Sequence, residues 1–122
     1  MPTVMVVDDA LFMRAFISKL FEEWGFTVVA QASNGKKAIA LFQELQPDLI
    51  TMDLTMPVMT GLEASKHIME EFPDARIIMI TALGQQRHVK EALAYGVKDF
   101  IVKPFKPEEL KQIVDTLFEN KA

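Results

Sequence analysis

The sequence has no cysteine, fewer basic than acidic residues and no long hydrophobic run, and each absence excludes a class of function. Without cysteine, zinc–thiolate sites, thiol nucleophiles and disulfide scaffolds are excluded. The net charge of −4 argues against nonspecific nucleic-acid binding. No apolar stretch approaches the roughly 18 residues of a membrane span, and the start of the chain lacks a signal-peptide pattern. We therefore expect a soluble, cytoplasmic protein that binds neither nucleic acid nor a membrane.

What the sequence does contain is enough apolar residues for one core. Half of its 122 residues are hydrophobic, whereas disordered chains combine low hydrophobicity with high net charge. This length fits one domain that folds without disulfide or metal cross-links. No repeat, low-complexity segment or linker interrupts the chain. We therefore expect residues 1–122 to form a single domain.

Two kinds of apolar pattern alternate along the chain. Short, nearly continuous runs rich in β-branched residues predict strands that are covered on both faces. These runs are 3–7, 27–30, 49–52, 76–80 and 99–102. Apolar residues at spacings of three and four predict helices within 13–24, 38–45, 62–72, 86–95 and 110–118. The pattern predicts an α/β doubly wound (βα)5 fold, a three-layer sandwich with helices on both faces of a parallel sheet.

Four of the five predicted strands are followed by short segments that contain an acidic, hydroxyl or amine side chain. They are Asp8 and Asp9 after the first strand, Asp53 after the third, Thr81 and Ala82 after the fourth, and Lys103 and Pro104 after the fifth. Any one of them alone would be interpreted as a turn residue, a helix cap or a surface amine. In a doubly wound sheet, however, ligands bind beyond the carboxyl ends of the strands. Three carboxylates, a hydroxyl and an ammonium at one edge therefore predict a functional site.

The predicted site offers only oxygen ligands to a metal, because it contains neither histidine nor cysteine. Such a set suits Mg²⁺, with Mn²⁺ as the alternative, and Mg²⁺ commonly combines one or two carboxylates with phosphate oxygens. Asp53 stands alone at its strand end and is placed to accept a phosphoryl group. The Thr81 hydroxyl and the Lys103 ammonium can contact phosphoryl oxygens. The residues thus predict metal-assisted formation of an aspartyl phosphate.

The motifs that carry these residues resemble the response-regulator receiver domain over essentially the whole chain. They are VVDD at 6–9, MDLTMP at 52–57 followed by Gly61, ITA at 80–82 and FIVKPF at 100–105. The resemblance implies a flavodoxin-like fold with strand order 2-1-3-4-5. It also implies that residues 1–122 are one receiver domain with no output domain.

The resemblance further implies how the acidic residues act. Asp53 would be the phosphorylation site. Mg²⁺ would be bound directly by Asp9 and Asp53, through water by Asp8, and by the backbone carbonyl of Thr55.

A second set of residues would respond to the phosphoryl group. By resemblance, Thr81, Ala82 and Lys103 contact it, and Phe100 is the switch aromatic whose rotation follows Thr81. The residues with structural roles are Pro104, after a cis peptide bond, and Gly61. Two positions depart from the usual pattern: Phe100 lacks the hydroxyl of the commoner tyrosine, and Thr60 replaces the Asp or Asn usual before Gly61.

As a function, the resemblance implies a single-domain response regulator of a two-component system rather than an enzyme. A chemotaxis histidine kinase would phosphorylate Asp53, and the phosphorylated, monomeric protein would bind the flagellar motor switch protein, with a phosphatase as a further partner. One alternative is a single-domain phosphorelay intermediate, which would share every site residue. Another is a small Mg²⁺-dependent aspartyl-phosphate phosphohydrolase, although such enzymes need a second acid where Thr55 stands.

The residues two positions after Asp53 and two after Thr81 flank the phosphoryl group in this family. Here they are Thr55 and Leu83. Leucine cannot orient a water molecule, so we expect slow self-dephosphorylation in comparison with a Leu83→Glu variant. Phosphoryl decay measured on both proteins tests this, and faster decay of the unchanged protein would contradict it.

Overall fold

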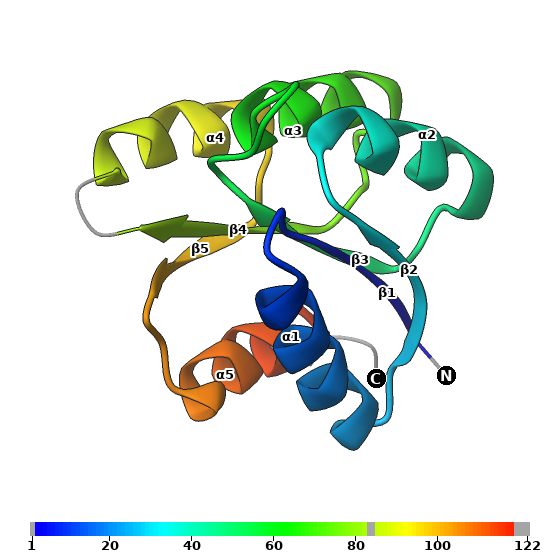
Figure 1. The fold of residues 1–122 in the computed structure, drawn as a ribbon. Helices are drawn as coiled ribbons and strands as arrows, with labels where there is room; N and C mark the ends of the chain where they lie inside the picture. The colour runs from blue at the N-terminus through cyan, green and yellow to red at the C-terminus, as the bar shows by residue number, and fades with distance from the viewer. Residues whose placement is uncertain (1, 83–84, 119–122) are drawn as a thin grey trace.

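The computed structural model describes residues 2–82 and 85–118, which form a five-stranded parallel sheet between two layers of helices (Figure 1). The strands are β1 (Thr3–Val7), β2 (Thr27–Ala32), β3 (Leu49–Asp53), β4 (Ile77–Ala82) and β5 (Asp99–Lys103). The helices are α1 (Leu11–Glu23), α2 (Gly35–Leu45), α3 (Gly61–Glu71), a 3₁₀ turn η1 (Gln86–His88), α4 (Val89–Tyr95) and α5 (Pro107–Phe118). The strand order β2-β1-β3-β4-β5 confirms the predicted doubly wound fold.

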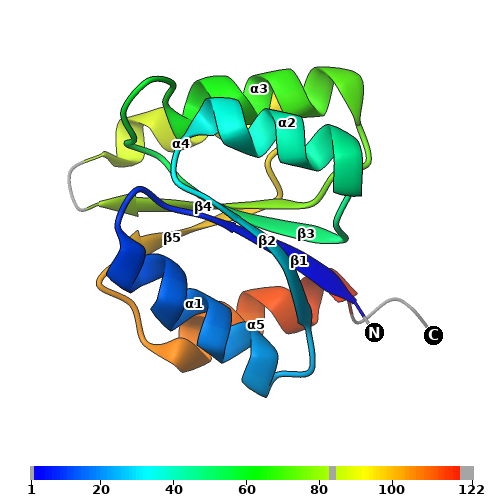
Figure 2. The same ribbon diagram turned by 45° about the vertical axis from the view of Figure 1, so that its right-hand side comes forward.

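Each face of the sheet carries its own apolar core. Helices α1 and α5 cover one face, and α2, α3 and α4 cover the other (Figures 1 and 2). The first core includes Ile17, Phe21 and Leu110, whereas Phe42 and Ile68 belong to the second. All five residues of β3 are buried, because this central strand is covered on both faces. The nearly continuous apolar runs of the sequence are explained by this two-sided burial.

The strands extend further at their carboxyl ends than the apolar runs predict. Strand β2 continues to Ala32 instead of ending at residue 30, and β4 includes Thr81 and Ala82. Backbone pairing explains the difference, since Val7 pairs with Ala32 and Ala82 pairs with Lys103. Ladder hydrogen bonds use backbone groups and therefore continue through Gln31 and Thr81, which interrupt the apolar runs.

The segment predicted as one helix over 86–95 is divided into a 3₁₀ turn and a short α-helix. The His88 N–H donates to the Gln85 carbonyl, which is a bond across three residues and typical of a 3₁₀ turn. Helix α4 then begins at Val89 and ends before Gly96, whose φ of 108° lies in the left-handed region. Among the described residues, no helix is long and apolar enough to cross a membrane.

The start of α3 is held against the end of β3. Thr60 caps this helix through a capping box, in which its hydroxyl accepts from the Glu63 N–H and the Glu63 carboxylate accepts from the Thr60 N–H. Threonine therefore supplies the cap that the usual Asp or Asn would make. A Cβ at Gly61 would collide with the backbone carbonyl of Asp53, so glycine is required for this close approach. These contacts fix the backbone next to the candidate site.

Candidate functional site

The carboxyl ends of the parallel strands bring the predicted polar residues to one edge of the sheet. Figure 2 shows the segments after β1, β3 and β5 at this same edge. Asp8 directly follows β1, Asp53 ends β3 and Lys103 ends β5, while Thr81 is the penultimate residue of β4. The pairings of β1 with β3, β3 with β4, and β4 with β5 make these ends neighbours. The structure thus assembles the residues that the sequence selects.

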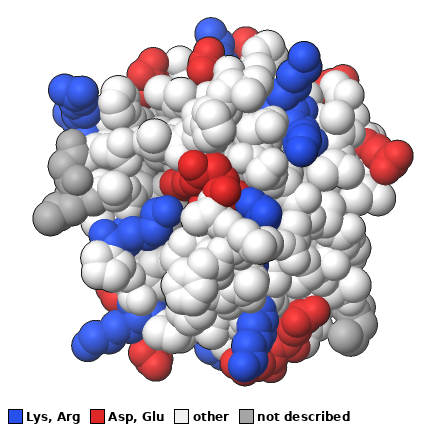
Figure 3. All heavy atoms as spheres, in the orientation of Figure 1, with Lys and Arg blue, Asp and Glu red and all other residues white. Residues whose placement is uncertain are grey.

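Three carboxylates form an acidic cluster at this edge. One oxygen each from Asp8, Asp9 and Asp53 can be chosen so that all three lie within 4.8 Å of one another. Asp8 and Asp53 are buried, whereas Asp9 is exposed. Asp8 is fixed on both sides, because its Oδ1 accepts from the Ala10 N–H at 2.9 Å and its backbone carbonyl accepts from Arg14 at 2.6 Å. Figure 3 shows acidic side chains gathered at the centre of this face, with basic side chains beside them.

Lys103 is the cation that faces the cluster. Its Nζ lies 3.3 Å from Asp8 Oδ2 and 3.4 Å from Asp53 Oδ1, so one ammonium is shared between two buried carboxylates. Three carboxylates and one ammonium leave two net negative charges. A like-charged cluster of this kind is a site where a divalent cation is favoured.

The electrostatic environment raises the pKa of Asp53 from 3.8 to about 6. Burial of the carboxylate is the largest cause, and the nearby charge of Asp8 adds to it. Lys103 opposes the increase by attraction and hydrogen bonding, and Asp9 contributes a smaller increase. The charged form of Asp53 is therefore disfavoured unless further positive charge is brought to the site.

The donor set fits Mg²⁺ and a phosphoryl group. All three acids supply oxygen ligands, as a hard divalent cation requires, and Thr55 lies exposed just beyond β3. Among the described residues, the buried Oγ of Thr81 has no hydrogen-bond partner. Ser18, Thr51 and Ser65 share this property but lie away from the carboxyl ends of the strands, whereas Thr81 is the penultimate residue of β4, at the same edge of the sheet as the cluster. A buried hydroxyl without a partner is energetically costly, which marks Thr81 as a group that could accept a ligand contact.

The remaining predicted residues lie around this centre. Ala82 is exposed at the end of β4, and Phe100 is half-buried in β5 and packs against the core under α2, α3 and α4. The Lys103–Pro104 peptide bond is cis, as the resemblance implies. Leu83 lies outside the described residues.

Two further polar residues belong to the site and were missed at the sequence level. Arg14 donates to the Asp8 carbonyl, and the side-chain amide of Gln85 connects Thr55, just after β3, with Ala82, the last residue of β4. Neither lies at a strand end, so the rule that selected the other residues does not select these two. Arg14 reaches Asp8 from the first turn of α1, and Gln85 reaches Thr55 and Ala82 from the segment after β4, so both contacts depend on geometry that strand periodicity does not give.

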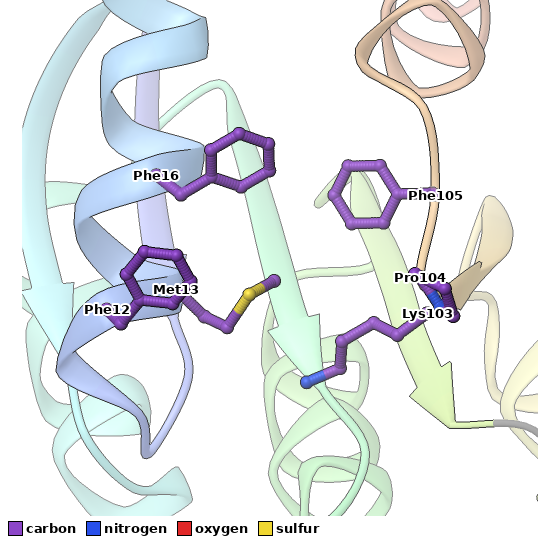
Figure 4. Close-up of a pocket in the computed structure, with 6 residues that line it drawn as sticks. All are labelled: Phe12, Met13, Phe16, Lys103, Pro104 and Phe105. Carbon is purple, nitrogen blue, oxygen red and sulfur yellow. The ribbon is translucent and has the colours of Figure 1, made fainter.

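An apolar pocket of about 360 Å³ lies beside Lys103. Figure 4 shows Phe12, Met13 and Phe16 on α1 facing Phe105 and Pro104 across it, with the Lys103 amine extended toward α1. Phe12 is 78% exposed and its neighbour Leu11 is 70% exposed. Large apolar side chains exposed next to a polar site are typical of a surface that contacts another protein.

The sequence matches the response regulator receiver domain over residues 4–115. The chain belongs to the receiver domain family. The chemotaxis protein CheY of Thermotoga maritima is 46% identical over 112 residues, which cover 92% of this chain and 93% of that protein. The Bacillus subtilis protein CcdB is 46% identical over 114 residues and covers 93% and 95%.

A solved structure of a receiver domain shows the same fold. The CheX–CheY–BeF3–Mg complex from Borrelia burgdorferi has a TM-score of 0.91 at 36% identity, covering 95% of this chain and 88% of that one. This receiver domain is therefore a CheY-like response regulator of two-component signalling, and such proteins are signalling switches. Receiver domains bind Mg²⁺ at an acidic pocket, which agrees with the cluster of three aspartates.

The raised pKa of Asp53 predicts a pH-dependent stability. This pKa is higher in the folded protein than in the unfolded chain, so the folded state binds more protons between about pH 4 and 6. The free energy of unfolding therefore falls as the pH rises through this window. The increase from 3.8 to about 6 is about two pKa units at about 1.4 kcal/mol each, so we expect Asp53→Asn to raise the free energy of unfolding by about 3 kcal/mol at about pH 7.5 without Mg²⁺.

Urea unfolding at several pH values measures this effect. The increase in the free energy of unfolding caused by Asp53→Asn should become smaller as the pH falls to about 4, because the Asp53 carboxyl of the unchanged folded protein is then protonated. The control is Asp74→Asn, which removes an exposed carboxylate at the opposite end of the sheet and should change stability by less than about 0.5 kcal/mol. A destabilised Asp53→Asn protein at neutral pH would contradict the prediction.

Proposed function

We propose that this receiver domain is a phosphorylation-controlled switch in which Asp53 accepts a phosphoryl group from a chemotaxis histidine kinase. The observation that carries the proposal is the arrangement at Asp53, whose carboxylate lies beside two acids, the Lys103 ammonium and the unpartnered Thr81 hydroxyl. A carboxylate oxygen of Asp53 attacks phosphorus, the bond from phosphorus to the histidine nitrogen breaks, and that nitrogen keeps the electron pair. The product is an aspartyl phosphate.

Mg²⁺ would be held by Asp8, Asp9, Asp53 and the Thr55 carbonyl, with Mn²⁺ as an alternative, and would supply positive charge to phosphoryl oxygens. Other residues of the chain would contact the phosphoryl group directly. Lys103 already contacts Asp53 and can follow the negative charge onto the phosphoryl group. The Thr81 hydroxyl and the Ala82 N–H donate to phosphoryl oxygens, and Thr81 gains the partner that it lacks in the resting state. Phosphorylation adds about −1.5 to −2 of charge, which is enough to bias a two-state surface.

The output would pass through the face made by α4, β5 and α5. Phe100 lies half-buried in β5 and pairs in register with Met79 of β4, the strand that also carries Thr81. Movement of Thr81 toward the phosphoryl group would open space for the Phe100 ring to turn inward. Lys90 and Lys98 are exposed nearby and would suit an acidic segment of the flagellar motor switch protein. The protein would act in the cytoplasm, where kinase and motor meet, and a phosphatase would reset it.

A phosphorelay role is the second candidate, and the exposed apolar start of α1 favours it. Leu11 and Phe12 offer a docking surface for a helix that carries the donor histidine close to Asp53. A phosphohydrolase remains the weaker alternative, because Thr55 supplies no carboxylate at the position where that mechanism needs one.

The phosphoacceptor role predicts Mg²⁺-dependent labelling at one residue. Incubation with acetyl phosphate and Mg²⁺ should add one phosphoryl group by intact mass, and Asp53→Asn or removal of Mg²⁺ should abolish it. The linkage should break down in alkali, as acyl phosphates do. An unaffected Asp53→Asn protein, or continued turnover of phosphomonoesters, would contradict the proposal.

The pocket beside Lys103 predicts a separate effect on the protein donor. We expect Phe12→Ala to slow transfer from a phosphorylated kinase domain by about tenfold, the loss that corresponds to one apolar anchor of about 1.4 kcal/mol. Labelling by acetyl phosphate should stay within about twofold, because a small donor needs no docking surface. The matched control is Leu45→Ala, since Leu45 is exposed at the far end of α2. Equal slowing with both donors would place Phe12 in the chemistry instead.

A further inference from the structure

The side-chain amide of Gln85 connects the segment after β3 with the last residue of β4. Its Oε1 accepts from the backbone N–H of Ala82 at 3.1 Å, and its Nε2 donates to the Thr55 hydroxyl at 2.6 Å. Ala82 directly follows Thr81 in β4, and Thr55 is the second residue after Asp53. One half-buried side chain therefore spans from the end of β3 to the end of β4.

Backbone hydrogen bonds hold Gln85 close to the residue that its side chain contacts. The Gln85 N–H donates to the Ala82 carbonyl at 3.1 Å, and the Gln85 carbonyl accepts from His88 at the start of the next helix. These bonds hold the Gln85 backbone beside the end of β4, so the side chain folds back on Ala82 without spanning a long distance. A carboxamide is suited to the position because it donates and accepts at the same time.

The bridge occupies a backbone donor that a phosphoryl group on Asp53 would use. We propose that Gln85 is a positioning residue that stabilises the resting state by holding the Ala82 N–H and the Thr55 hydroxyl, an inference that rests on the proposed function of Asp53. On phosphorylation, the Ala82 N–H passes from the Gln85 amide oxygen to a phosphoryl oxygen. The same exchange releases Gln85 from Ala82, so formation of the phosphorylated state and loss of the bridge are coupled.

The coupling has a defined sign. A resting-state contact that must break lowers the apparent affinity for any phosphoryl group, by the factor that the contact contributes to the resting state. Loss of one partly exposed hydrogen bond corresponds to about three- to tenfold in an equilibrium. Removing the Gln85 amide should thus favour the phosphorylated state, whereas a stronger acceptor at this position should oppose it.

Beryllofluoride with Mg²⁺, a phosphoryl mimic, is the probe that measures this equilibrium. Gln85→Ala should bind it about three- to tenfold more tightly than the unchanged protein, because the Ala82 N–H is no longer held by a side chain. Gln85→Glu should bind it more weakly by a similar factor, since a carboxylate accepts the Ala82 N–H more strongly and repels the anion. In amide NMR spectra, the Ala82 resonance of free Gln85→Ala should differ from that of the unchanged protein. The control is Gln43→Ala. This variant removes an amide hydrogen bond between α2 and the last residue of α3, Glu71, and it should leave the affinity for beryllofluoride within twofold.

The results separate the two proposals. If the unchanged protein and Asp53→Asn respond to beryllofluoride in the same way, the phosphoacceptor function itself is wrong. If the unchanged protein binds and Gln85→Ala binds equally or more weakly, the function stands and the role of Gln85 is overturned. Opposite shifts for Gln85→Ala and Gln85→Glu support the inference, because a purely structural role would make both variants weaker.

Discussion

The molecule depends on keeping the buried carboxylates of Asp8 and Asp53 together at one edge of its sheet. An oxygen of each lies within 4.8 Å of the other, so the two like charges repel, and burial of Asp53 adds a cost of desolvation. Lys103 offsets both effects, since its ammonium lies within 3.4 Å of an oxygen of each acid. One cation cannot neutralise the whole cluster, and the raised pKa of Asp53 is the consequence. The cluster therefore keeps a net negative charge, which favours the binding of a cation.

The rest of the fold holds these charges in place. Central strands buried on both faces fix the backbone of Asp8 and Asp53, and the close approach of Gly61 fixes the segment that follows Asp53. The loops are held more weakly, through side-chain hydrogen bonds such as those of Gln85. Because contacts of this kind contribute about 1 kcal/mol each, the loops can rearrange while the strands stay fixed. This division places the fixed charges on strands and the responsive contacts on loops.

The same division explains how much could be predicted from the sequence. Strand periodicity and the rule that ligands bind at carboxyl strand ends were sufficient to select Asp8, Asp53, Thr81 and Lys103, because strand position determines where their backbones lie. The ends of β2 and β4 were predicted too short, since backbone pairing continues beyond the apolar residues. Arg14 and Gln85 were missed because their contacts arise from loop and helix geometry that follows no period. Residues that act through strand position are predictable from one sequence, whereas residues that act through loop conformation need the structure.

A switch of this construction exchanges hydrogen-bond partners instead of creating new donors. In the resting state the Lys103 ammonium is bound to carboxylates, the Ala82 N–H is bound to Gln85, and the Thr81 hydroxyl has no partner within the described structure. An anion on Asp53 would draw on all three groups, and only the Thr81 contact would be wholly gained. In the proposed switch, the two states would differ by a small number of hydrogen-bond contacts, each contributing about 0.5 to 3 kcal/mol. A single phosphoryl group can shift such an equilibrium, whereas a site with every donor free at rest would bind anions without discriminating between the two states.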